Sequence, residues 1–108
     1  MKPARLSPQA RRDILEATRW IMADNPEAAR AFRIAIDKAT LLLGAHPRAG
    51  RERSELIDSP ARVLFLTNFP YVLVYDAETV PPLVLRILHG ARDLPELMGD
   101  FEQVERDH

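Results

Sequence analysis

Two amphipathic stretches joined by Asn25-Pro26 constrain the fold of this 108-residue chain more than any other feature. Each stretch opens with a helix-start signal, Ser7-Pro8 or Asn25-Pro26, because Ser and Asn side chains cap free N–H groups and Pro lacks one. Apolar residues recur at three- and four-residue spacing up to about Asp24, and again up to Gly44, a suitable C-terminal cap. The first stripe holds Ala10, Ile14, Ala17 and Ile21, and the second holds Ala28, Phe32, Ala35, Ile36, Ala39, Leu42 and Leu43. Two helices with so short a connection must form an antiparallel hairpin.

From Arg62 onward the pattern becomes strand-like. Three short runs rich in Val, Leu, Ile, Phe and Tyr cover Arg62–Thr67, Tyr71–Asp76 and Leu83–His89, and hairpin-length connections separate them. They predict an antiparallel meander. Residues 45–60 are interpreted as a loop with at most a short strand near Leu56. We therefore expect an α+β fold in which an N-terminal antiparallel helical hairpin packs on a three- to four-stranded antiparallel sheet.

The middle strand is apolar on both faces. Val72 and Val74 fall on one side, and Tyr71, Leu73 and Tyr75 fall on the other. The helical hairpin can cover only one of these two apolar faces of the sheet. An acidic C-terminal segment, about residues 94–108, could dock on the second face or on a partner through Leu94, Leu97, Met98 and Phe101. The under-covered sheet points to a protein partner.

Composition narrows the class of protein. The length predicts one domain over residues 1–108. The chain has no cysteine, which excludes disulfides, a thiol nucleophile and Cys-ligated metals, and its apolar runs are too short to cross a bilayer. We expect a cytoplasmic protein with no membrane contact. Residues 1–92 hold 14 Lys and Arg against 10 Asp and Glu, whereas residues 93–108 hold six acids and Arg106.

Candidate chemistry is sparse. His89 is the only histidine near the strands, and His46 and His108 lie elsewhere, so neither a metal nor another cofactor is expected. A metal-free ribonuclease would use His89 as general acid or base and arginines to stabilise charge on phosphate, with Arg62, Arg86, His89 and Arg92 as its candidate set. The alternative is that His89 is structural. Arg86, in mid-strand, is expected to point to the rim of the sheet, or to pair with Asp76 or Glu78 across the hairpin or with a partner's carboxylate.

A basic loop carries Arg48, Arg51 and Arg53 without interleaved aromatic residues, so it has no aromatic side chain on which a nucleic-acid base could stack. We therefore expect no direct sequence-specific binding of nucleic acid. No nucleophile elbow surrounds Ser54 or Ser59, and the chain has no Gly-rich phosphate loop.

The order of elements and two motifs resemble the RelE/ParE superfamily of bacterial type II toxins. The motifs are PYVLVY at residues 70–75 and VLRILHGARD at residues 84–93, and the Asn25-Pro26 helix start and the Pro-x-x-Gly at Pro47–Gly50 accompany them. The resemblance spans about Arg5 to Leu97. It implies a toxin neutralised by a cognate antitoxin that covers the helices and the apolar sheet face.

The superfamily has two activities. Its RelE branch, a ribosome-dependent mRNA endoribonuclease, carries basic residues on two strands, an arginine after the last strand and a C-terminal aromatic residue. The corresponding positions here are Val63, Phe65, Val72, Arg92 and Met98, so only the arginine is kept. An alignment shifted by one residue would place Arg62 at one of the basic positions. These departures favour the ParE branch of plasmid stabilisation toxins, whose members bind DNA gyrase and perform no chemistry themselves.

The resemblance therefore implies a gyrase inhibitor held inactive by a ParD-like antitoxin. The alternatives are a RelE-like ribonuclease and an inactive homologue that only binds antitoxin. The expected antitoxin- or target-binding residues are Trp20, Arg48, Arg51, Arg53, Tyr71, Tyr75, Arg86 and Arg92.

Overall fold

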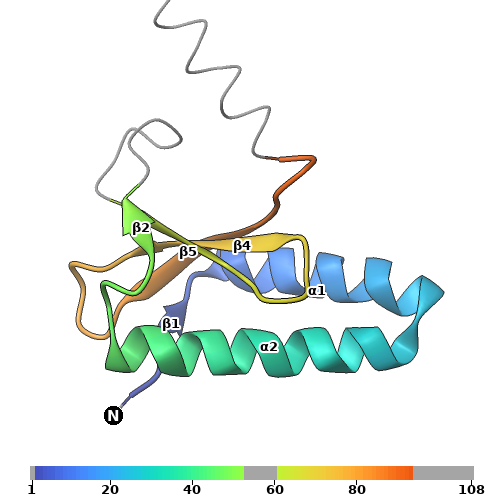
Figure 1. Cartoon of the computed structure of the whole chain (residues 1–108), viewed down its shortest axis with the longest axis horizontal. Helices are drawn as coiled ribbons and strands as arrows, with labels where there is room; N and C mark the ends of the chain where they lie inside the picture. The colour runs from blue at the N-terminus through green and yellow to red at the C-terminus, as the bar shows by residue number, and fades with distance from the viewer. Residues whose placement is uncertain (1, 53–60, 94–108) are drawn as a thin grey trace, which may run out of the picture.

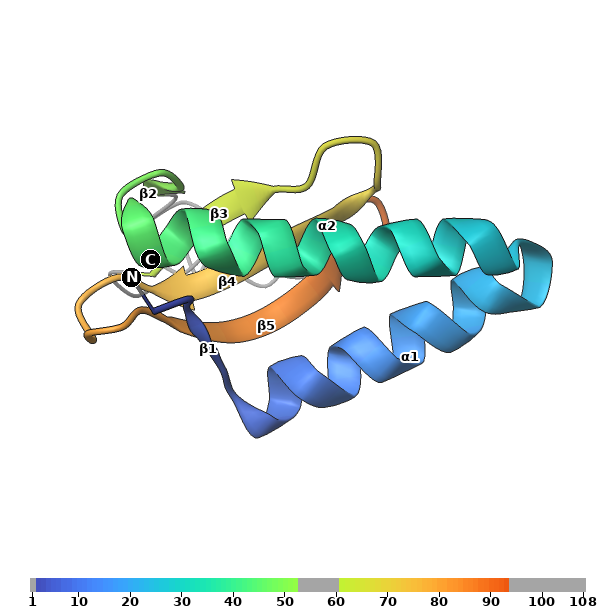
Figure 2. The same ribbon diagram turned by 90° about the horizontal axis from the view of Figure 1, so that it is seen from below.

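The computed structural model describes residues 2–52 and 61–93. In chain order the elements are β1 (Arg5–Leu6), α1 (Pro8–Asp24), α2 (Pro26–Ala45), β2 (Arg51–Glu52), β3 (Arg62–Phe65), β4 (Tyr71–Asp76) and β5 (Leu83–His89). The two helices lie side by side and cover one face of the sheet (Figures 1 and 2). None of the described helices is long and apolar enough to span a membrane.

The predicted helical hairpin is confirmed, and its connection is a single shared cap. The Asn25 N–H donates to the carbonyl of Ile21 (2.8 Å) and closes α1, while the Asn25 side chain accepts from the Ala28 N–H (3.1 Å) and opens α2. Ser7 caps α1 in the same way through the Ala10 N–H (3.0 Å). Each cap satisfies a backbone group that the helix itself leaves without a partner.

Gly44 has a different role from the one predicted. The second helix continues through it to Ala45, and His46 forms the C-cap. A Cβ at position 44 would lie 2.1 Å from the carbonyl oxygen of Lys2. The glycine therefore allows the N-terminal segment to cross α2 in close contact, and the Ala4 N–H donates to the Thr40 carbonyl (2.8 Å) beside it.

The sheet has five strands in the order β1-β5-β4-β3-β2 and is mixed, which corrects the expected three- to four-stranded antiparallel sheet. The meander β3-β4-β5 is antiparallel as predicted, but β1 pairs in parallel with β5 through Arg5 and Leu83. The loop after α2 forms the edge strand β2 at Arg51 and Glu52, whereas the strand predicted near Leu56 falls outside the described residues. Two-residue strands are too short to display an alternating pattern, so the sequence did not reveal them.

Both faces of the sheet carry a buried cluster. On the helix face, Phe32 and Ile36 of α2 pack with Leu73 and Tyr75 of β4. On the opposite face, Ala61, Val63, Val72, Val74 and Leu88 form a second cluster. The residues expected to dock there, Leu94, Leu97, Met98 and Phe101, lie outside the described part of the chain.

Candidate functional site

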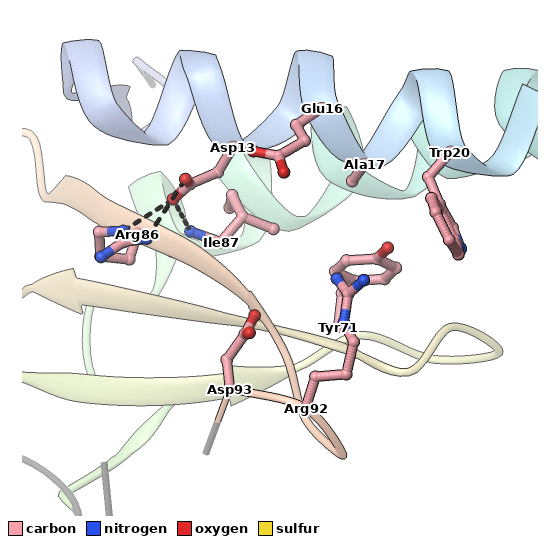
Figure 3. Close-up of a pocket in the computed structure, with 9 residues that line it drawn as sticks. All are labelled: Asp13, Glu16, Ala17, Trp20, Tyr71, Arg86, Ile87, Arg92 and Asp93. Carbon is pink, nitrogen blue, oxygen red and sulfur yellow. Dashed lines mark hydrogen bonds and ion pairs between the residues drawn. The ribbon is translucent and has the colours of Figure 1, made fainter. Parts of the chain in front are cut away.

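A pocket of about 540 Å³ opens between α1 and the C-terminal end of β5 (Figure 3). Its upper wall is one face of α1, because residues 13, 16, 17 and 20 follow the three- and four-residue spacing of a single helix side. Strands β4 and β5 and the turn after β5 form the opposite wall. The lining residues are Asp13, Glu16, Ala17, Trp20, Tyr71, Arg86, Ile87, Arg92 and Asp93.

Asp13 lies at the inner end of the pocket. Its carboxylate accepts from Nε of Arg86 (2.9 Å), from the Ile87 N–H (3.0 Å) and from Nε2 of Gln9 (2.9 Å). Burial opposes the charge and would raise the pKa of Asp13, but the hydrogen bonds from Arg86, Gln9 and Ile87 outweigh burial and hold that pKa below its usual value. The hydrogen bond to Asp13 in turn raises the pKa of Arg86, despite partial burial. This pair fixes the guanidinium of Arg86 in one orientation.

The predicted partner of Arg86 was therefore wrong. The arginine pairs within the chain, but with Asp13 of α1 and not with Asp76 or Glu78 across the hairpin. Asp76 instead accepts from the backbone N–H of Glu78 (2.8 Å). The sequence did contain a signal for Asp13, because it stands three residues after Ala10 and four before Ala17, inside the apolar stripe of α1.

Side chains also form hydrogen bonds with the backbone of β5 along the edge that continues past its pairing with β1. The register of β5 on β4 skips Leu85, and the carbonyl of this residue accepts from the Ser7 hydroxyl (2.9 Å). Asp13 accepts from the Ile87 N–H, and Asp93 accepts from the His89 N–H (2.7 Å). Such capping protects a sheet edge from pairing with another chain. The same contacts place Arg86 and the turn after β5 around the pocket.

The outer end of the pocket pairs a cation with an aromatic ring. The guanidinium of Arg92 lies 5.9 Å from the ring centre of Trp20, a residue that is 68% exposed. The Arg92 N–H donates to Nδ1 of His89 (3.2 Å), which fixes the turn that carries the arginine. His89 in turn packs edge-on against Tyr71, with ring centres 5.2 Å apart. Burial raises the pKa of Tyr71, and the nearby charge of Arg92 partly offsets this effect.

The other predicted residues lie at the opposite end of the sheet. Tyr75 donates its hydroxyl hydrogen to the Pro47 carbonyl (2.7 Å) and accepts from the Gly50 N–H (2.8 Å). Arg62 donates to the Gly50 carbonyl (2.9 Å) and pairs with Glu52 (3.2 Å). These bonds hold the loop that follows α2. Tyr75 therefore has a structural role, and its side chain is fully buried.

The predicted contact residues thus separate into two groups. Trp20, Tyr71, Arg86 and Arg92 come together in the pocket, although Tyr71 is only 4% exposed, so this tyrosine lines the pocket from within the core and does not form the outer surface. Tyr75, Arg48 and Arg51 belong to the distant loop region, where the two arginines are exposed. Arg53 lies outside the described residues. Asp13, Glu16, Ile87 and Asp93 line the pocket without having been predicted as contact residues.

No cluster of three or more His, Asp or Glu side chains that could hold a metal is found in residues 2–52 and 61–93. The pocket offers an exposed indole, two guanidinium groups and the carboxylates of Glu16 and Asp93 around an open cavity.

The fold is that of a known toxin–antitoxin structure. A solved structure described as the chromosomal ParDE system from P. aeruginosa superposes with a TM-score of 0.67 at 20% sequence identity, covering 82% of this chain and 96% of that chain. No curated protein matches the sequence significantly. The family model described as the ParE toxin of the type II toxin–antitoxin system parDE matches residues 4–94. The chain therefore belongs to the ParE toxin family.

Proposed function

We propose that this ParE-type toxin acts in the cytoplasm by binding DNA gyrase and trapping it on cleaved DNA, and that a ParD-like antitoxin neutralises it. The observation that carries the proposal is the convergence of Trp20, Arg86 and Arg92 on one open pocket. Trp, Tyr and Arg are the residue types that most often dominate binding energy at protein interfaces. A toxin that works by binding needs such a surface and needs no catalytic group.

The pocket is also suited to tight binding because its arginines are already positioned. Asp13 orients Arg86 through two contacts, Nε–Oδ2 at 2.9 Å and Nη2–Oδ1 at 3.4 Å. Arg92 rests beside the indole of Trp20. Side chains ordered before association lose less conformational entropy when a partner binds.

Arg62 lies apart from the other residues of the ribonuclease alternative, Arg86, His89 and Arg92. In the sheet register, Arg62 of β3 lies opposite Tyr75 of β4, and His89 of β5 lies opposite Tyr71 of β4. Tyr71 and Tyr75 are four residues apart, so Arg62 and His89 are separated by about 13 Å along the strand direction. Arg86 is engaged by Asp13, and Nδ1 of His89 accepts the Arg92 N–H. General acid–base cleavage requires the proton-transfer group and the charge-stabilising groups to meet around one phosphate. The distance of Arg62 and the contacts that already occupy Arg86 and Nδ1 of His89 support a binding function over mRNA cleavage.

A paired reaction tests the proposal. The purified chain is incubated with DNA gyrase, ATP and supercoiled plasmid, and in parallel with translating ribosomes and labelled mRNA. We expect linear, protein-linked plasmid and intact mRNA. Cut mRNA with intact plasmid would establish the ribonuclease alternative. If neither product forms while the chain still binds its antitoxin, the chain is an inactive homologue and the gyrase proposal is wrong.

A further inference from the structure

The exposed arginines of the loop after α2 do not line the pocket. Arg48 and Arg51 are exposed on this loop, and Lys2 is exposed near the start of the chain. The N-terminal segment lies at the same end of the molecule, because Gly44 in the last turn of α2 packs against the backbone of Lys2 and Pro3. Figures 1 and 2 both show this segment at the C-terminal end of α2. We name the surface formed by Lys2, Arg48 and Arg51 the basic end.

A buried tyrosine fixes the backbone of this loop. The Tyr75 hydroxyl donates to the Pro47 carbonyl (2.7 Å) and accepts from the Gly50 N–H (2.8 Å). A Cβ at Gly50 would lie 2.6 Å from Cε1 of Tyr75, so a larger residue could not pass this close to the ring. Arg48 lies between the two anchored residues, and Arg51 follows directly after Gly50. Their backbone positions are set before a partner binds, which reduces the conformational entropy lost on association.

The positive charge of the basic end is not neutralised within the described part of the chain. Among residues 2–52 and 61–93, none of its three side chains has an ion pair or a hydrogen bond. Glu52, the acidic residue next to Arg51, instead pairs with Arg62 (3.2 Å). Cations that are left without internal partners attract a partner that carries closely spaced anions.

The basic end has no aromatic ring on which a base could stack. Residues 46–52 contain no Phe, Tyr or Trp, and the ring beneath the loop, that of Tyr75, is fully buried. Proteins that bind single-stranded nucleic acid use exposed aromatic rings for stacking. Double-stranded DNA instead presents one phosphate charge per about 1.7 Å of helix axis, and the planar guanidinium of arginine matches phosphate geometry. The basic end therefore fits the backbone of a duplex better than a single strand.

We propose that the basic end contacts backbone phosphates of double-stranded DNA, independently of base sequence. The inference rests on the proposed function only in taking this duplex to be the DNA that gyrase holds. The chain then contacts the complex at two places, gyrase through the pocket and DNA through the basic end. Association with DNA-bound gyrase is favoured over association with free gyrase, because the second contact forms within a complex that already exists.

The first test measures binding of the full chain to a short labelled duplex by fluorescence anisotropy at several salt concentrations. Three phosphate contacts predict a slope of log affinity against log salt of about −2.7. The double variant Arg48→Gln/Arg51→Gln removes two contacts, so its slope should be about −0.9 and its affinity at low salt about tenfold lower or less. Replacing both arginines by Lys keeps the charge and should retain most of the slope.

Arg30→Gln/Arg33→Gln is the matched control. Both arginines are exposed on α2 and lie outside the basic end, and the variant loses the same charge. It should keep the wild-type slope and affinity. Equal slopes and affinities for the two double variants would overturn the proposal, whether or not the wild-type chain inhibits gyrase. Tighter binding to a single-stranded RNA of the same length would also overturn it, because the partner would then be RNA.

The second test compares gyrase with and without DNA. Arg48→Gln/Arg51→Gln should bind DNA-free gyrase within about threefold of the wild-type affinity, but plasmid cleavage should require a concentration about tenfold higher or more. A loss of affinity for DNA-free gyrase as large as the loss in plasmid cleavage would assign the basic end to gyrase itself and refute the proposal. A wild-type chain that binds the duplex with the expected slope but yields no cleaved plasmid would refute the proposed function and support the DNA contact.

Discussion

Replacing Asp13 tests the central contact of the pocket. Asp13→Ala removes the acceptor of the buried Ile87 N–H and the partner of Arg86. An orphaned buried N–H costs about 1–3 kcal/mol. The ion pair adds at most about 1 kcal/mol, because the Arg86 side chain is 48% exposed and water screens it. The expected loss of unfolding free energy is therefore about 1–4 kcal/mol.

Urea denaturation of the purified chain measures this loss. With a slope of about 1.5 kcal/mol/M, the midpoint should fall by about 0.7–2.7 M. Asp13→Asn keeps an oxygen that can accept from the Ile87 N–H, so its urea midpoint should lie between those of the wild type and Asp13→Ala. Glu16→Ala is the matched control, because it removes an exposed carboxylate from the same helix face, and it should change stability by less than about 0.5 kcal/mol. Equal midpoints for Asp13→Ala and Glu16→Ala would refute the reasoning.

Two further predictions concern pH and packing. Because the pKa of Asp13 in the folded chain lies below its ordinary value of 3.8, its contribution to stability is complete well above that pH and is lost as the pH falls through the folded-state pKa. The stability difference between wild type and Asp13→Asn, followed by urea denaturation from pH 7 to pH values of about 2–3, should shrink, and a constant difference would contradict the assigned pKa direction. Gly44→Ala should destabilise the chain in thermal unfolding, because the added Cβ meets the Lys2 carbonyl, whereas the same change in an ordinary helix interior stabilises by about 1 kcal/mol.

Local signals explain what the sequence could predict. The shared cap at Asn25, the apolar stripes of both helices and the period of β4 and β5 are properties of neighbouring residues, so their bounds were predicted closely. The predicted strand Arg62–Thr67 was too long by two residues. The strand β3 ends at Phe65, where the Leu66 N–H donates to the Tyr71 carbonyl (3.0 Å) and Asn68 adopts a positive φ of 69°.

Contacts between distant parts of the chain could not be read in the same way. The parallel pairing of β1 joins residues 5 and 83, and the Asp13–Arg86 pair joins residues 73 positions apart. Both depend on how the first helix packs against the last strand, which no local pattern encodes. The alternation in β4 placed Tyr71 and Tyr75 on one face, but only the packing showed that this face is the one beneath the helices.

The most direct test of the account compares gyrase inhibition by the wild-type chain and by Trp20→Ala. Trp20 is largely exposed, so its removal should leave the unfolding free energy nearly unchanged while the concentration needed for gyrase-mediated plasmid cleavage rises by about 30-fold or more, as for the loss of a binding hot spot. Met22→Ala, at a 52% exposed site of the same helix outside the pocket, should match the wild type. Equal inhibition by Trp20→Ala and the wild-type chain would contradict the claim that this pocket binds gyrase.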